Sequence, residues 1–195
     1  MPLHQYNGFW LSKKHIQGIL NFQNHYQAHD SDALLVTFPK SGTTWLKALT
    51  FTILNQSVKQ SRCKIVYLCR NPKDLFVSTW RFVNKLLEPD AQRLVSIENA
   101  FEKFCQGVIG YGPFWDHMLE YHKESLKSPD KVMSLRFEEL KSKPVEVLKD
   151  LAEFMGYGSS QEEEGGNVVI DILKLCSFES LSSMEVIRLE IHGTR

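Results

Sequence analysis

Short apolar runs alternate with longer amphipathic stretches along this chain. Residues 33–38 (ALLVTF) and 64–69 (KIVYLC) are rich in β-forming side chains and are closed by turn residues, and residues 132–136 (VMSLR) repeat the pattern. A short apolar run bounded by turn signals is typical of a buried strand. We therefore expect strands at these three positions.

The stretches between and after these runs have helical spacing. Apolar residues recur in this way over 45–53, 96–108, 112–126 and 145–155, and Pro72 opens a further stretch that we expect to be helical as far as Leu87. Strands that alternate with helices predict an α/β fold, with a parallel sheet and helices on both of its faces. Ligands bind such sheets beyond the carboxyl ends of the strands, so we expect the functional site there.

Length and composition favour one domain over residues 1–195. Hydrophobic residues make up 43% of the chain, which is enough to fill a core and too much for a disordered chain. The 23 basic residues balance the 23 acidic residues, so we expect neither nucleic acid nor a membrane as a partner. The polar run at 162–166 predicts a surface turn.

Cysteine spacing and the amino-terminal sequence indicate whether to expect a metal site, a redox motif or a membrane segment. The four cysteines form no CxxC pair, so the sequence spells out neither a zinc site nor a redox motif, and we expect no metal. The chain has no basic start followed by a long apolar stretch, and no window approaches the ~18 apolar residues that a spanning helix needs. We therefore expect a cytoplasmic protein.

The first strand leads into a turn, residues 40–45 (KSGTTW), that opens directly into a helix. Peptide N–H groups at a helix start lack intrahelical partners and lie at the positive end of the helix dipole, so this turn suits a phosphate. Gly42 permits close approach and Lys40 adds a positive charge. Further donors are the hydroxyls of Ser41, Thr43 and Thr44. The alternative is a structural turn with a surface lysine.

Lys40 precedes Gly42, whereas the GxxxxGK[ST] nucleotide loop needs its lysine directly after the glycine. An ATP-hydrolysing loop is therefore disfavoured. The second strand ends in Arg70, at a position where a magnesium-dependent nucleotide enzyme would place a carboxylate. This difference also argues against a kinase or another ATP-dependent enzyme.

Arg70 and the turn at 40–45 follow two neighbouring strands, and Ser78 lies about two helical turns after Arg70. Because adjacent strands lie ~4.8 Å apart, two anion-binding strand ends would form one pocket for a ligand with two separated phosphates. The alternative is that Arg70 pairs with Asp74 or another carboxylate and that Ser78 is only a helix residue.

Five segments together resemble the cytosolic sulfotransferases, particularly their plant branch. They are Thr37–Leu46, Tyr67–Asp74, Val108–Leu119, Ser134–Lys141 and Leu175–Glu179. The resemblance implies a single α/β domain with a P-loop-like fold. It also implies an enzyme that transfers a sulfonate from 3′-phosphoadenosine-5′-phosphosulfate to a hydroxyl or amine of a small acceptor and leaves adenosine 3′,5′-bisphosphate.

The resemblance implies roles for particular residues. Residues 40–45, from Lys40 to Trp45, would bind the 5′-phosphosulfate and adenine side of the donor, and Lys40 would stabilise charge on the bridging oxygen. Arg70 and Ser78 would bind the 3′-phosphate. The donor site would also include Phe137, which stands where many members of the family have tyrosine, and Ser177.

Two departures from the family pattern lie at residues 55–63 and after Phe178. Members of the family carry several tens of residues at the first position, including a strand and a histidine that takes the acceptor's proton. We therefore expect a missing strand region and no counterpart of that histidine, with packing or surface roles for His117 and His122. The family's Arg-Lys-Gly loop and dimer segment are also absent, so either a monomer or an oligomer is compatible with the sequence.

Two functions follow from these observations. The first is a sulfotransferase that acts on hydroxylated small molecules. The second is a catalytically silent product that binds nucleotide weakly or serves as an interaction module, because it lacks the histidine and the loop. Sulfonate transfer from the donor separates the two, and calorimetry with adenosine 3′,5′-bisphosphate separates nucleotide binding from its loss.

Overall fold

The computed structural model describes residues 2–54, 63–87, 94–157, 168–177 and 179–180. The expectations for residues 55–62, 162–166, Phe178 and the carboxyl-terminal segment lie outside the described residues. Within the described residues, no helix is long and apolar enough to cross a membrane.

The three expected strands form one parallel sheet in the order β3-β4-β5. They are β3 (Ala33–Thr37), β4 (Lys64–Cys69) and β5 (Val132–Arg136). The register pairs Thr37 with Leu68 and Cys69 with Arg136, so the three carboxyl ends lie along the same edge of the sheet. The residues that follow each strand are therefore brought together at this edge, as the sequence predicts for an α/β fold.

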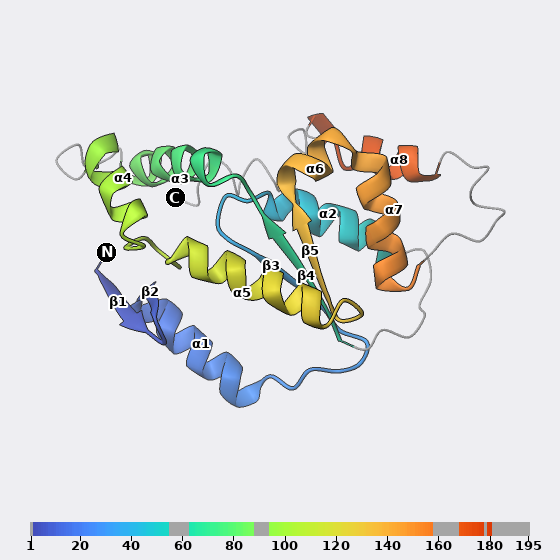
Figure 1. Cartoon of the computed structure of the whole chain (residues 1–195), viewed down its shortest axis with the longest axis horizontal. Helices are drawn as coiled ribbons and strands as arrows, with labels where there is room; N and C mark the ends of the chain where they lie inside the picture. The colour runs from blue at the N-terminus through green and yellow to red at the C-terminus, as the bar shows by residue number, and fades with distance from the viewer. Residues whose placement is uncertain (1, 55–62, 88–93, 158–167, 178, 181–195) are drawn as a thin grey trace.

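Helices cover both faces of the sheet (Figure 1). On one side lies α5 (Phe114–Lys127), and on the other lie α2 (Thr43–Leu54), α7 (Pro144–Met155) and α8 (Val168–Leu175). Three further helices follow strands of this sheet or lie between them in the chain: α3 (Pro72–Leu87), α4 (Ile97–Cys105) and α6 (Phe137–Ser142).

Alternate residues of β4 face the two helical layers. Val66 and Leu68 join a buried cluster with residues of α2, α7 and α8, which includes Leu49, fully buried at 0% exposure. Tyr67 faces the other layer and stacks on Tyr121 of α5, with 4.5 Å between the ring centroids. A second cluster, beyond the end of β3, joins Phe38 to residues of α3, α4 and α5.

Two expected helices have different ends in the structure. The helix expected over 96–108 ends at Cys105, because Gly107 adopts a left-handed φ of +74° soon after. The helix expected over 112–126 begins at Phe114, after Pro113, and ends at Lys127.

The amino-terminal part forms a hairpin and a helix that the sequence analysis did not anticipate. Strands β1 (Leu3–Tyr6) and β2 (Phe9–Ser12) pair antiparallel and lead into α1 (Lys13–His25). Trp10 donates its N–H to the Gly112 carbonyl at 2.8 Å, and Tyr111 donates its own to the Trp10 carbonyl at 2.7 Å. These two hydrogen bonds join the hairpin to the segment that precedes α5.

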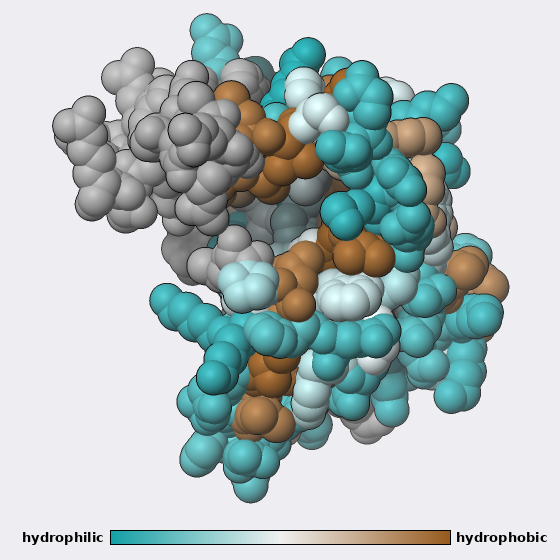
Figure 2. Space-filling model, turned by 90° about the vertical axis from the view of Figure 1, so that its left-hand side faces the viewer, coloured by the Kyte–Doolittle hydropathy of each residue, from teal (hydrophilic) through white to brown (hydrophobic). Residues whose placement is uncertain are grey.

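Exposed apolar side chains occur on the outer surfaces of α3 and α4, for example Leu86 and Phe101, at 61% and 54% exposure. Figure 2 shows the side of the molecule that lies at the left in Figure 1, where brown apolar patches border a hollow and are separated by hydrophilic surface. The apolar surface visible there is therefore divided and forms no continuous band.

Candidate functional site

Three functional candidates follow the three strands of the sheet: Lys40 after β3, Arg70 after β4 and Phe137 after β5. Arg70 Nη1 donates a hydrogen bond to the Lys40 carbonyl oxygen at 3.0 Å. The Arg70 guanidinium also lies 4.8 Å from the centroid of the Phe137 ring, a cation–π distance. The structure therefore brings the two cationic strand ends into direct contact.

The backbone of the turn adopts conformations that side chains other than glycine seldom favour. Lys40 has φ +69° and Gly42 has φ +102°. A Cβ atom added to Gly42 would lie 2.8 Å from Phe137 Cδ2, closer than real Cβ contacts allow. Glycine is thus required both by the backbone angle and by the neighbouring ring. The hydroxyls of Thr37 and Thr43 lie 2.5 Å apart and close the turn.

Several buried polar atoms at this edge have no hydrogen-bond partner within the described residues. They are Ser41 Oγ, Trp45 Nε1 and Arg70 Nε. Buried polar atoms are usually paired, so a group of unpaired ones indicates a site that a ligand or water completes. Because these atoms surround the amino terminus of α2, where peptide N–H groups are free of intrahelical partners, the residues fit a phosphate group.

The Lys40 side chain reaches across the turn to α3. Its Nζ lies 4.4 Å from the centroid of the Phe82 ring. Partial burial, then the nearby charges of Arg70 and Lys85, lower the pKa of Lys40 below its ordinary value. Ser78 is half-buried one helical turn before Phe82, so it shares the face of α3 that lies toward Lys40.

In the part of the chain that the structure describes, Arg70 is not paired with a carboxylate. Among the described residues, the Arg70 guanidinium forms no ion pair, with Asp74 or with any other acid. Glu138 instead accepts a hydrogen bond from the Asn71 N–H at 2.8 Å. Asn71 Oδ1 in turn accepts the Lys73 N–H at 2.9 Å and so stabilises the first turn of α3. Among the described residues, no carboxylate therefore competes with an anion for this guanidinium.

A pocket of about 310 Å³ lies against the same turn. Its lining residues are Thr37, Phe38, Pro39, Thr43, Tyr111 and His117. Tyr111 adopts a left-handed φ of +67°, and its hydroxyl lies 2.8 Å from His15 Nε2 of α1. The sequence analysis expected a packing or surface role for His117, and nothing in the spacing of α5 indicated that this residue would line a pocket beside the turn.

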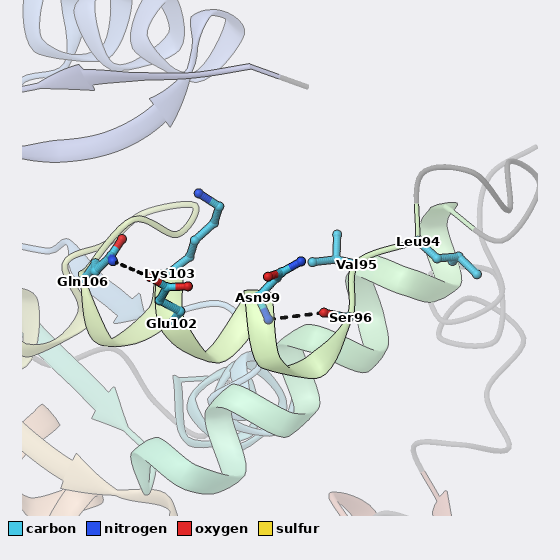
Figure 3. A pocket seen from close by; sticks show the side chains of 7 residues that line it. All are labelled: Leu94, Val95, Ser96, Asn99, Glu102, Lys103 and Gln106. Atoms are coloured by element: carbon cyan, nitrogen blue, oxygen red, sulfur yellow. Dashed lines mark hydrogen bonds between the residues drawn. The ribbon is translucent and has the colours of Figure 1, made fainter.

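A larger hollow, of about 490 Å³, lies along α4 and away from the strand ends. Figure 3 shows that its side chains come from α4 and the residues that flank it on both sides, with Ser96 and Glu102 engaged in local hydrogen bonds with Asn99 and Gln106. This hollow lacks any residue of the sheet or of the turn. We therefore take the smaller pocket as the site, because it shares Thr43 with the turn that carries Lys40.

Ser177 lies just after α8, and its hydroxyl oxygen accepts the Ser180 N–H at 3.2 Å. No hydrogen bond, ion pair or ring contact in the described part of the chain links Ser177 to the turn at Lys40–Trp45. Within the same ranges, no three histidine, cysteine or acidic side chains gather as a metal site would require.

The fold and the site together define a class of protein. A parallel sheet carries a cationic, phosphate-fitting turn at its carboxyl edge, and a pocket that shares Thr43 lies beside that turn. This arrangement is typical of an enzyme that transfers a group between a nucleotide and a small molecule.

Comparison with known proteins identifies the family. The family described as the sulfotransferase domain matches residues 30–57 and 49–192. Cytosolic sulfotransferase 13 of Arabidopsis thaliana is 38% identical over 94% of this chain and 72% of the relative, and cytosolic sulfotransferase 12 of the same plant is 40% identical over the same shares. The chain belongs to the sulfotransferase family and is a transferase of the plant cytosolic type.

Solved structures agree with the family. The crystal structure of a candidate steroid sulphotransferase of Arabidopsis thaliana is 36% identical and superposes with a TM-score of 0.75, covering 97% of this chain and 84% of that chain. Mouse sulfotransferase SULT7A1, complexed with PAP, is 23% identical with a TM-score of 0.73, covering 93% of this chain and 76% of that one. The second likeness supports the fold.

The alignment with the relatives also contains a gap in this chain. The match to cytosolic sulfotransferase 13 extends over 234 residues, whereas 94% of this 195-residue chain is about 183 residues, so roughly 50 positions of the alignment carry no residue of this chain. The family match divides into two segments around residues 49–57. The division lies next to the short connection at 55–63, where the sequence analysis expected a missing region.

Proposed function

We propose that this sulfotransferase takes its sulfonate from 3′-phosphoadenosine-5′-phosphosulfate and transfers it to a hydroxyl of a small acceptor. The observation that carries the proposal is the hydrogen bond from Arg70 Nη1 to the Lys40 carbonyl oxygen at 3.0 Å, which supports one anion site shared by the two cationic strand ends. A donor with two separated phosphate groups matches two such ends. The PAP named with the mouse structure is the nucleotide product of this donor, which supports the same assignment.

In this proposal the turn binds the 5′ end of the donor. The hydroxyls of Ser41, Thr43 and Thr44 and the free N–H groups of α2 donate to the phosphosulfate, while Gly42 lets the backbone approach it. Lys40 places its ammonium where negative charge grows on the bridging oxygen as the S–O bond breaks.

Arg70 and Ser78 bind the 3′-phosphate on the other side of the same edge. The rings of Trp45 and Phe137, which meet edge-to-face with 5.9 Å between centroids, form the apolar surface against the adenine. Ser177 belongs to this donor site by the family resemblance alone.

The acceptor occupies the pocket beside the turn. The rings of Phe38, Tyr111 and His117 and the ring of Pro39 suit an apolar body, and the Thr37 and Thr43 hydroxyls suit a polar end. A volume of about 310 Å³ limits the buried part of the acceptor to a small molecule. Because the pocket and the turn share Thr43, the acceptor hydroxyl lies next to the phosphosulfate.

Titration calorimetry with adenosine 3′,5′-bisphosphate tests the donor site. Arg70→Ala removes charge-assisted hydrogen bonds that contribute about 1.5–3 kcal/mol, so the affinity should fall about 10- to 100-fold. Arg81→Ala is the matched control, because Arg81 is an exposed arginine of α3 that makes no recorded polar contact within the described residues. The affinity of Arg81→Ala for the bisphosphate should equal that of the unaltered protein.

Equal affinity in Arg70→Ala and the unaltered protein would contradict the assignment of the 3′-phosphate site. A failure of the unaltered protein to bind the bisphosphate at all would contradict the donor itself. Transfer of labelled sulfonate to a panel of phenols and alcohols then separates an active enzyme from a silent nucleotide-binding protein, an alternative that nothing in the comparisons favours.

A further inference from the structure

We propose that His117 is the general base of this enzyme and takes the proton from the acceptor hydroxyl. The inference rests on the proposed function, because it concerns the acceptor in the pocket beside the turn. It gives a catalytic role to a side chain whose sequence context indicates only packing.

His117 reaches the pocket from α5 and lines it together with Thr37, the last residue of β3, and Thr43 of the phosphate-fitting turn. A hydroxyl bound there would meet the turn on one side and the imidazole on the other. His117 is half-buried, so its ring is partly enclosed and partly open to a ligand. This position satisfies the first requirement for a base, which is reach to the reacting group.

The ring of His117 is held by contacts on several sides. Its Nδ1 lies 3.1 Å from the Tyr67 hydroxyl, and the edges of Phe9 and Phe38 lie against it, with 6.2 and 5.9 Å between ring centroids. Nε2 makes no hydrogen bond within the described residues. When Nδ1 donates its proton to the Tyr67 oxygen, Nε2 carries a lone pair and can accept a proton.

The surroundings favour the neutral imidazole that a base requires. Burial lowers the pKa of His117 below its ordinary value. The titratable groups that face the ring are the tyrosines Tyr67 of β4, Tyr121 of α5 and Tyr111 before α5, and burial raises the pKa of each phenol. All three phenols are neutral near pH 7, and among the described residues no charged side chain contacts the imidazole ring, so the surroundings favour its neutral form.

Other described histidines do not offer a free nitrogen to the pocket. Both ring nitrogens of His15 are engaged, Nδ1 with Ser12 Oγ at 2.7 Å and Nε2 with the Tyr111 hydroxyl at 2.8 Å. His122 lies on α5 but is exposed, and it does not line the pocket.

The step conserves atoms and charge. The acceptor O–H bond breaks, and its proton passes to His117 Nε2. The acceptor oxygen forms a bond to the donor sulfur as the bond from sulfur to the bridging phosphate oxygen breaks. The electron pair of that bond stays on the phosphate oxygen, near Lys40, and the products are the sulfated acceptor, adenosine 3′,5′-bisphosphate and a protonated imidazole.

Two acceptors of different acidity test this role. 4-Nitrophenol, assayed at a pH where it is already ionised, needs no base, whereas benzyl alcohol must lose its proton during the reaction. His117→Asn should therefore lower kcat/KM for benzyl alcohol about 10²- to 10⁴-fold and change the value for nitrophenolate only slightly. His122→Asn, an exposed histidine of the same helix, is the control and should leave both values unchanged.

A positioning role for Tyr67 gives a second readout. Tyr67→Phe removes the hydroxyl that faces Nδ1 but retains the ring, so the pH at which benzyl alcohol turnover declines on acidification should shift. In the unaltered protein, turnover of benzyl alcohol should fall as pH drops through the pKa of His117, and this profile keeps the test valid even where His117→Asn does not fold.

The outcomes separate the two proposals. Bisphosphate binding by His117→Asn, together with unchanged turnover of benzyl alcohol, overturns the base and leaves the proposed function standing. An equal loss with both acceptors also overturns the base, because it indicates a structural defect. Absence of bisphosphate binding in the unaltered protein overturns the proposed function itself.

Discussion

At the scale of single residues, Gly42 has the strictest requirement in the phosphate-fitting turn. Its φ of +102° and the Phe137 ring 2.8 Å from a would-be Cβ both oppose a side chain. Gly42→Ala should therefore lower the free energy of unfolding by about 1–3 kcal/mol, measured by urea denaturation.

Gly18 is the matched control for this substitution. It lies inside α1 with no atom within 4 Å of an added Cβ. Gly18→Ala should therefore stabilise the protein by about 0.5–1 kcal/mol, because alanine favours a helix. Equal effects of the two substitutions would show that the turn does not need glycine.

The turn and its candidate phosphate-binding residues could be predicted from the sequence, because the signals that mark them lie next to one another in the chain. A strand, a glycine and a helix start are local signals, and Lys40 and Arg70 follow directly from them. The contact of Phe137 with Gly42 could not be predicted in this way. It depends on side-chain packing between segments 95 positions apart, and so does the place of His117 in the pocket.

At the scale of elements, strong periodicity made the central strands and α3 predictable. The helix expected over Pro72–Leu87 has those same bounds in the structure. The hairpin β1–β2 was missed because its strands have four residues each, too few for a clear alternation, and because β1 is largely exposed. The six-residue helix α6 is likewise too short for two full repeats of helical spacing.

The attachment of α2 to the sheet determines where the turn lies, and Leu49 lies at the centre of that contact with 0% exposure. Leu49→Ala should lower the free energy of unfolding by about 2–5 kcal/mol, because it leaves a cavity between α2 and β4. Leu126→Ala on α5 is the control, since Leu126 is 72% exposed, and should change stability by less than about 0.5 kcal/mol. A loss below 1 kcal/mol for Leu49→Ala would contradict this core assignment.

At the scale of the whole molecule, a chain with a formal net charge of zero concentrates positive charge at one edge of its sheet. Burial, and then the positive charges of Arg70 and Lys85, lower the pKa of Lys40 below its ordinary value. The proposed attraction of an anionic nucleotide would therefore depend on this site and not on the overall charge.

This local field predicts how pH affects the binding of adenosine 3′,5′-bisphosphate. An anion favours the protonated ammonium, so the pKa of Lys40 is higher in the complex than in the free protein. Affinity should therefore be full below the free-protein pKa and should fall as pH rises through it. Calorimetry across alkaline pH measures this decline, and Lys40→Arg, which keeps its charge, should abolish it. The same decline in Lys40→Arg would assign the effect to another group.

The shared position of Thr43 has a kinetic consequence. Thr43 belongs both to the turn and to the lining of the neighbouring pocket, and its hydroxyl is fixed 2.5 Å from that of Thr37. In the proposed binding mode, the nucleotide and the acceptor would be separated only by the gap that the transferred sulfur crosses. Direct transfer of the sulfonate across this short distance requires both substrates to be bound at once, in a ternary complex. Double-reciprocal plots at varied donor concentration should therefore intersect instead of running parallel.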